Sequence, residues 1–141
     1  MEKKDLKPAG VFKYFEEICQ VPRPSKKEEK MIAYLKAFGA KHNLETKVDE
    51  AGNVLIKKPA TPGKENLQTV VLQSHIDMVC EKNNDVQHDF LTDPIETEID
   101  GEWLKAKGTT LGADNGIGVA TELAILADDS IEHGPLECLF T

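Results

Sequence analysis

The sequence has 141 residues, of which 40% are hydrophobic and 30% are charged, as is typical of one globular domain with a single hydrophobic core. A formal net charge of −8 is poorly matched to phosphates and anionic lipids, so we expect neither a nucleic-acid nor a membrane partner. The first ten residues are too polar for a signal peptide, and no apolar run reaches the ~18 residues that a membrane span needs.

The three cysteines, Cys19, Cys80 and Cys138, are odd in number and widely spaced, so we expect no disulfide framework and a cytoplasmic location. Cys80 follows His75 closely enough to bind a metal with it, but no second cysteine lies nearby to complete a thiolate cluster. We therefore interpret Cys80 as a buried or loop thiol.

Two helices are expected at the beginning of the chain. Residues 8–20 carry apolar side chains at helical spacing, and Pro22 and Pro24 then end the helix. The Ser-x-x-Glu pattern at 25–28 predicts a capping box, which would open a second helix running to about residue 38. We interpret both helices as structural, because their apolar stripes are suited to a core.

Two short strands, residues 46–49 and 53–57, are predicted to form a hairpin, and a polar loop rich in proline and glycine follows. The next strand begins at Val70. Residues 70–72 are a continuous apolar run, which is typical of a strand buried on both faces of a mostly parallel sheet.

That strand ends at the first candidate site residues. His75 and Asp77 are two positions apart, so in an extended chain their side chains project to the same side. The carboxyl ends of strands are where open α/β sheets usually carry their sites. The pair therefore indicates either metal or acid/base chemistry, or else polar residues where a strand becomes a loop.

Residues 80–92 show no periodicity and are expected to form a loop, which holds the adjacent pair His88 and Asp89. We interpret that pair as loop residues outside the site. A second hairpin, with strands at 95–99 and 102–106, is predicted around the turn Asp100-Gly101, and its Trp103 is expected to pack.

A glycine-rich loop at 112–118 leads into a helix expected at 115–127, and its function has three candidate interpretations. A phosphate loop is disfavoured, because neither known glycine spacing is present and Asp114 would place a carboxylate against the phosphate. Asp114 could instead cap the helix. It could also present both oxygens to two cations about 3.5–4 Å apart, as a bridging carboxylate does.

The last expected element is a strand at 136–140. Helices and strands alternate along the chain without internal repeats. The predicted fold class is α/β, with a mixed, mostly parallel central sheet flanked by helices.

The motifs in combination resemble the metallopeptidase family of zinc-dependent dipeptidases and carboxypeptidases. The resemblance rests on SHIDMV at 74–79, Asp-Gly at 100–101 and GADNGIG at 112–118. It is strongest toward the cytosolic non-specific dipeptidase branch, the aminoacyl-histidine dipeptidases or peptidase D. That branch is suggested by VCEK at 79–82 and HGPLE at 133–137, and the match extends over essentially the whole chain.

The resemblance implies a role for each candidate residue. His75 would be a ligand of one metal, Asp77 the catalytic-site carboxylate that orients His75, and Asp114 the carboxylate that bridges two metals. The peptide bond between Asp114 and Asn115 is expected to be cis in the full-length enzyme, whereas either isomer is open for this segment alone. The implied cofactors are two divalent ions, zinc with cobalt or manganese as alternatives, and no organic cofactor site is expected.

The resemblance also implies what the chain does and what it lacks. Residues 1–141 would be the N-terminal part of a zinc-exopeptidase-like catalytic domain, without the general base, the remaining ligands and a lid or dimerisation domain. The full-length enzyme would be a homodimer that hydrolyses Xaa-Xaa dipeptides, including Xaa-His, whereas this segment alone would be inactive. The alternatives are a deacetylase, tripeptidase or carboxypeptidase on the same scaffold, or a non-catalytic α/β interaction module.

Overall fold

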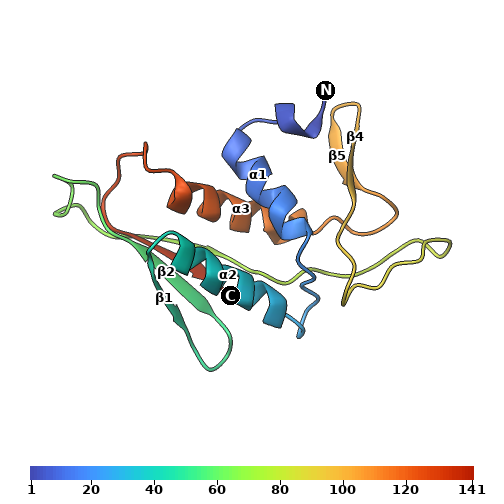
Figure 1. Ribbon diagram of the computed structural model, residues 1–141, viewed down its shortest axis with the longest axis horizontal. Coiled ribbons are helices and arrows are strands. Elements are labelled where there is room, and N and C mark those ends of the chain that lie inside the picture. The colour runs from blue at the N-terminus through green and yellow to red at the C-terminus, as the bar shows by residue number, and fades with distance from the viewer.

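The computed structural model describes residues 1–141 as three α-helices, six strands and one 3-10 turn (Figure 1). In chain order the elements are η1 (Lys3–Asp5), α1 (Ala9–Cys19), α2 (Glu29–Lys41), β1 (Glu45–Val48), β2 (Val54–Lys58), β3 (Val70–Ser74), β4 (Thr97–Asp100), β5 (Trp103–Ala106), α3 (Ala113–Ala127) and β6 (Leu136–Phe140). Every predicted helix and strand is present, with bounds shifted by a few residues. None of the helices combines the length and apolar character required to span a bilayer.

The central sheet has the strand order β1-β2-β6-β3. Its β1–β2 and β2–β6 pairs are antiparallel and its β3–β6 pair is parallel. The α/β class with a mixed sheet is therefore confirmed. Parallel pairing was expected for most of the sheet but is confined to β3 and β6. The short turn between β1 and β2 can join only antiparallel neighbours, and β6 also runs antiparallel to β2.

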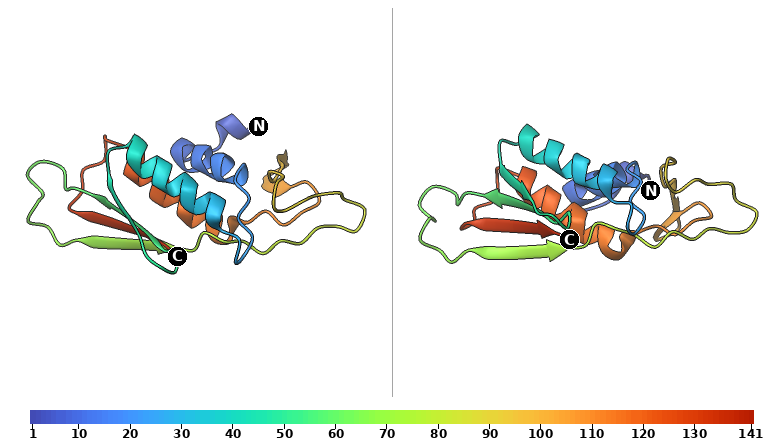
Figure 2. Two further views of the ribbon diagram at one scale, coloured as in Figure 1. Left: turned by 60° about the horizontal axis from the view of Figure 1, so that its bottom comes forward. Right: turned by 90° about the horizontal axis from the view of Figure 1, so that it is seen from below.

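Strand β3 lies at the edge of the sheet. It pairs with β6 on one side only, and Val70 and Val71 are 51% and 55% exposed. The prediction that this strand is buried on both faces is therefore wrong. All three helices lie on the same face of the sheet, so an apolar residue on β3 is covered only where it faces them (Figure 2).

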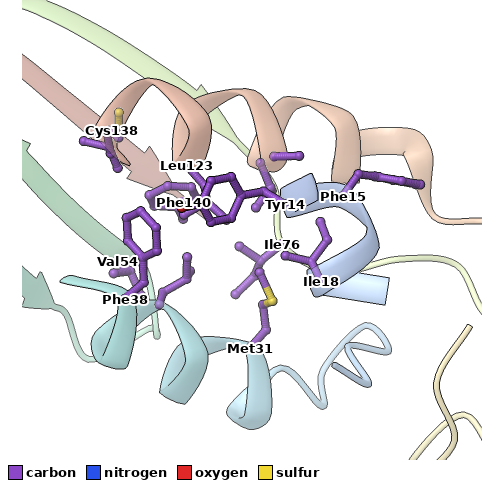
Figure 3. Close-up of a cluster of buried hydrophobic side chains, with 14 of the residues drawn as sticks. Tyr14, Phe15, Ile18, Met31, Phe38, Val54, Ile76, Leu123, Cys138 and Phe140 are labelled. Atoms are coloured by element: carbon purple, nitrogen blue, oxygen red, sulfur yellow. The ribbon is translucent and has the colours of Figure 1, made fainter. Parts of the chain in front are cut away.

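The hydrophobic core fills the space between the helices and the covered face of the sheet (Figure 3). Side chains at helical spacing on α1, α2 and α3 meet alternate side chains of β2 and β6, as the two periodicities require. The fully enclosed members include Phe15, Ile18, Met31, Leu35, Val54, Ile56, Val119, Leu123, Cys138 and Phe140.

The predicted capping box at the start of α2 is wrong. The helix begins at Glu29, and the Glu28 carboxylate accepts a hydrogen bond from the backbone amide of Lys26, at 2.7 Å. The Ser25 hydroxyl donates to the Asp77 carboxylate instead of accepting from the helix. A partner distant in sequence has therefore taken the side chain that the local pattern assigned to a cap.

The second hairpin, β4 and β5, stands apart from the central sheet. Leu104 and Ala106 share one face of β5 and pack against the core. Trp103 lies on the opposite face and is 75% exposed, so the expectation that it packs is wrong. A two-stranded hairpin can place only one of its faces against the core.

Glu122 is a buried carboxyl on the face of α3 that covers the sheet. It is 3% exposed and lies beside Ser74 and Cys138, yet its Oε2 atom has no hydrogen-bond partner. Burial raises the pKa of Glu122 from 4.5 to about 7, against the weaker opposing effect of these two neighbours. Between pH 4.5 and about 7, the Glu122 carboxyl of the folded protein therefore keeps a proton that the unfolded chain has already released.

We expect this proton to make stability fall as the pH rises. Below pH 4.5 Glu122 is protonated in both the folded and the unfolded state, so its burial causes no pH-dependent loss of stability. Between pH 4.5 and about 7 the unfolded chain releases the proton first and the free energy of unfolding falls. Above about pH 7 this loss is complete. Glu122→Gln should therefore reduce the loss of unfolding free energy between about pH 5 and about pH 8 by on the order of 2 kcal/mol. Urea unfolding measures this loss, with Glu98→Gln as the exposed control. An unchanged pH dependence in Glu122→Gln would contradict the assignment.

Candidate metal centre

The site lies at the carboxyl end of β3, where the chain stays extended beyond the strand. The backbone amide of Ile76 donates to the carbonyl of Thr141 at 2.8 Å, and the amide of Thr141 donates to the carbonyl of Ser74 at 2.9 Å. These bonds prolong the parallel pairing of β3 with β6. His75 and Asp77 therefore project to the same side of the extended segment, as their spacing predicts.

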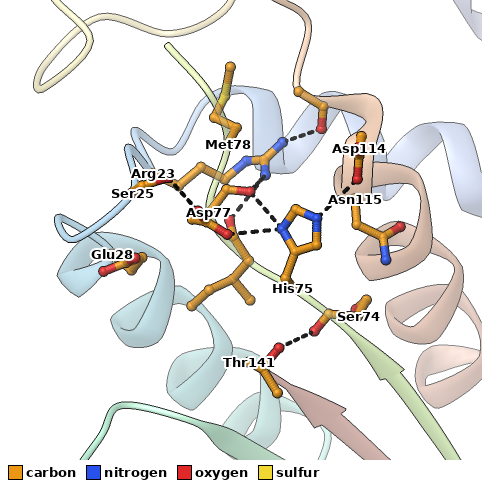
Figure 4. A network of polar contacts seen from close by, with 12 residues as sticks. Arg23, Ser25, Glu28, Ser74, His75, Asp77, Met78, Asp114, Asn115 and Thr141 are labelled. Atoms are coloured by element: carbon orange, nitrogen blue, oxygen red, sulfur yellow. Dashed lines mark hydrogen bonds and ion pairs between the residues drawn. The ribbon is translucent and has the colours of Figure 1, made fainter.

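The imidazole of His75 lies between two carboxylates (Figure 4). Its Nδ1 atom is 2.9 Å from Oδ1 of Asp77, and its Nε2 atom is 3.0 Å from Oδ1 of Asp114. The structure thus brings together all three residues that the sequence singled out, although Asp114 is 39 positions away from His75.

The start of α3 presents Asp114 outward. The peptide bond between Asp114 and Asn115 is cis, as the resemblance led us to expect, and both residues lie outside helical φ/ψ values. The side chain of Asn115 accepts a hydrogen bond from the backbone amide of Gly118 at 3.2 Å. Asn115, rather than Asp114, therefore bonds to the backbone of the turn after the kink, and the N-cap residue Gly112 has no side-chain cap. The Asp114 side chain is 98% exposed, with His75 as its only side-chain partner.

Two contacts of the site were not predicted from the sequence. The hydroxyl of Ser25 donates to Oδ2 of Asp77, so that this carboxylate is held by a serine on one oxygen and by His75 on the other. Arg23 donates from its guanidinium to backbone carbonyls on both sides of the site. The only sequence signal was the Pro-Arg-Pro-Ser run between two helices, which indicated a break in helical structure but no contact.

These contacts shift two pKa values in opposite directions. Partial burial disfavours the charged form of His75, but the neighbouring carboxylates of Asp114 and Asp77 outweigh it and raise the pKa of the imidazole. The hydrogen bond from Ser25 is the main cause that lowers the pKa of the Asp77 carboxyl, and His75 contributes in the same direction. The site is therefore suited to an ionised Asp77 beside an imidazole whose pKa is raised.

The donor atoms fit part of a metal site. An imidazole nitrogen and a carboxylate oxygen are ligands that zinc prefers, and both His75 and Asp114 are accessible from solvent. No three His, Cys, Asp or Glu side chains come together to hold a metal ion. This segment thus offers two donors to a metal, whereas a catalytic zinc usually has about three from the protein.

The other candidate ligands do not join this pair. Cys80 donates its thiol hydrogen to the carbonyl of Met78, and burial raises the pKa of the thiol. The ring of His88 packs on Phe90 with centroids 4.4 Å apart, and the Asp89 carboxylate accepts the amide of Leu91 within its own loop. The interpretation of Cys80 as a loop thiol and of His88 and Asp89 as loop residues agrees with these contacts.

Comparison with known proteins supports the resemblance. No protein-family model matches the chain. The chain is 52% identical over 140 residues to the cytosol non-specific dipeptidase of Escherichia coli K12. The aligned region covers 99% of the chain and 29% of that protein. It is 54% identical to a solved aminoacylhistidine dipeptidase from Vibrio alginolyticus, with a TM-score of 0.96 over 100% of the chain and 29% of that structure.

More distant structures share the fold alone. A tripeptidase from Staphylococcus aureus matches with a TM-score of 0.73 at 21% identity, and the aminopeptidase PepT from Bacillus cereus matches with a TM-score of 0.75 at 24% identity. Each match covers 94% of the chain and 35% of the other structure. The chain is therefore similar throughout to dipeptidases, as the motifs predicted, and it spans about three-tenths of the length of the two most similar of these relatives.

Proposed function

We propose that the full-length protein is a metal-dependent cytoplasmic dipeptidase that hydrolyses Xaa-Xaa dipeptides, including Xaa-His. The observation that carries this proposal is the Asp77–His75–Asp114 arrangement at the open end of β3. It occurs in a chain that is 52% identical to a cytosol non-specific dipeptidase and 54% identical to an aminoacylhistidine dipeptidase. The names of these two relatives motivate the substrate class and the location.

Each of the three side chains has a separate task in this proposal. Asp77 accepts the Nδ1 hydrogen of His75, which leaves the Nε2 lone pair free to bind a metal and fixes the ring. Asp114 directs its exposed carboxylate to Nε2 of His75 and would be the residue that holds two ions together. Ser25 holds the second oxygen of Asp77, so that the carboxylate cannot rotate away from the imidazole.

The metal would supply the Lewis acidity of the reaction, because divalent zinc polarises a carbonyl and lowers the pKa of water to about 7. Zinc is our first choice from the nitrogen and carboxylate donors, with cobalt and manganese as alternatives. In this proposal the residues described here bind and orient, and the proton of the attacking water passes to a general base outside residues 1–141.

The proposal therefore requires more protein than this segment. We propose that residues 1–141 form the N-terminal part of the catalytic domain, and that the remaining ligands, the general base and a lid or dimerisation domain lie elsewhere in a homodimeric enzyme. Two observations support this. Only two metal donors, His75 and Asp114, converge here, and the relatives are more than three times as long as the region that matches this chain.

The direct test is hydrolysis of an Xaa-His dipeptide by the purified full-length protein. We expect turnover that a chelator abolishes and that added zinc restores, because the attacking water depends on the metal. An amino-acetylated form of the same dipeptide separates this activity from that of a deacetylase. Hydrolysis that is insensitive to the chelator, or hydrolysis of the acetylated compound alone, would contradict the proposal.

A further inference from the structure

Arg23 is a buried cation without a carboxylate partner. The residue is 2% exposed, and its guanidinium forms hydrogen bonds only with backbone carbonyls. Nη1 donates to Ile76 at 3.0 Å and, more weakly, to Asp77 at 3.4 Å, while Nη2 donates to Gly112 at 2.7 Å. Burying a charge is costly unless its hydrogen bonds are satisfied, so this arrangement calls for a specific explanation.

The carbonyls belong to the two segments that carry the candidate ligands. Ile76 and Asp77 directly follow His75, and Gly112 lies two positions before Asp114. One planar guanidinium thus connects the strand end to the loop that begins α3 (Figure 4). Its donors have a fixed fork geometry, so the two segments can approach only at one spacing.

The backbone around Arg23 strengthens the same connection. The carbonyl of Arg23 accepts from the amide of Met78 at 3.0 Å, and Pro24 forms a parallel bridge with Met78. Ser25 adds its bond to Asp77. The turn between α1 and α2 therefore runs beside the segment that follows His75 and is bonded to it by main chain as well as side chains.

The glycines of the loop leave room for this guanidinium. A Cβ atom at Gly112 would lie 2.7 Å from Nη2 of Arg23 and 2.8 Å from Sδ of Met78. A Cβ atom at Gly116 would also lie 2.7 Å from Nη2. A side chain at either position would therefore displace the guanidinium, so the loop that presents Asp114 packs closely around Arg23.

We propose that Arg23 is a positioning residue, which holds Asp114 at the distance from His75 that both need to act on one metal centre. This inference rests on the proposed dipeptidase function. Arg23 itself is enclosed and bonds only to backbone carbonyls, so its effect passes through the two backbone segments. A lysine could donate to one segment but could not bridge both with a rigid fork.

Lys58 offers a matched control. It is also buried, at 8% exposed, and its ammonium donates to the carbonyls of Ile125 and Asp128 at the opposite end of α3. In the sheet it pairs with Leu136, at the far end of β6 from the site. Lys58→Met therefore removes a buried cation from helix-end carbonyls without touching the segments of His75 and Asp114.

The experiment compares full-length wild type, Arg23→Met, Arg23→Lys and Lys58→Met. For both Arg23 variants we expect kcat for an Xaa-His dipeptide to fall on the order of 10²-fold, because misplacement of about 1 Å has that effect. KM should change by less than roughly threefold, since substrate contacts remain. Lys58→Met should keep the wild-type kcat although its thermal midpoint also falls. In metal-free crystals of Arg23→Lys, Asp114 should lie farther from His75 than the 3.0 Å of the wild type.

Three results would overturn the positioning role. The first is a kcat loss in the Arg23 variants no larger than that in Lys58→Met, and the second is an unchanged distance between Asp114 and His75 in Arg23→Lys. The third is failure of both Arg23 variants to fold while Lys58→Met folds, which would make Arg23 a requirement of folding. If wild type itself hydrolyses no dipeptide, the proposed function fails, and the crystallographic distance still decides whether Arg23 positions the pair.

Discussion

Replacing Asp114 by alanine in the full-length protein is expected to abolish dipeptide hydrolysis, and His75→Ala is expected to do the same. Asp114 contributes a carboxylate that is almost fully exposed and directed at His75, so its removal costs both metals one ligand in our proposal. His75→Ala removes the nitrogen donor of one metal. When either donor is missing, the ions are bound weakly and water is no longer activated. Steady-state kinetics together with counting of bound zinc measures both effects.

Asp77→Ala should give an intermediate result. Asp77 orients the imidazole without binding metal in our proposal, and carboxylates in that position typically contribute roughly 10–100-fold to metal affinity or activity. Asp100→Ala is the control, because Asp100 is an exposed carboxylate on the separate hairpin that pairs with Lys105. Full activity in Asp114→Ala would refute the bridging role, and a loss in Asp100→Ala equal to that in Asp77→Ala would refute a specific role for Asp77.

The isolated 141-residue segment is expected to hydrolyse no dipeptide measurably, even with added zinc. It gathers two donors and no cluster of three, so metal binding should be weak. In our proposal the general base also lies outside this segment. Loss of positioned acid/base catalysis alone typically costs roughly 10²–10⁴-fold.

The comparison requires the segment and the full-length protein under the same conditions. Circular dichroism shows whether the segment retains its helices and strands, and zinc titration shows whether His75 and Asp114 bind metal without further donors. Genuine turnover by the purified segment would show that its own residues provide a complete catalytic site, in conflict with the donor count.

Elements whose formation depends on local periodicity were predictable from the sequence. The apolar spacing on α1 and α3 and the turn between β4 and β5 gave their bounds within a few residues. The spacing of His75 and Asp77 correctly placed them on one side of an extended segment, and the resemblance led to Asp114 as their neighbour. The metal-binding and catalytic roles of these residues stay predictions that the experiments above test.

Features that depend on contacts distant in sequence could not be predicted. An apolar run such as that of β3 is compatible with an inner or an edge strand, because burial depends on which neighbours pair with it. Ser25 matched a local capping pattern, yet its hydroxyl bonds to Asp77, 52 positions away. An arginine between two prolines gives no sign that it will be enclosed, because the carbonyls that bind Arg23 come from segments up to 89 positions away.

Anomalous diffraction at the zinc edge from crystals of the full-length protein would show whether His75 and Asp114 bind metal. We expect two zinc peaks, one of them about 2.0–2.1 Å from Nε2 of His75, with the Asp114 carboxylate within about 2.0–2.2 Å of both. In that state Asp77 should still contact Nδ1 of His75, as it does here at 2.9 Å. Zinc peaks in an active enzyme with both His75 and Asp114 beyond coordination distance would contradict the account.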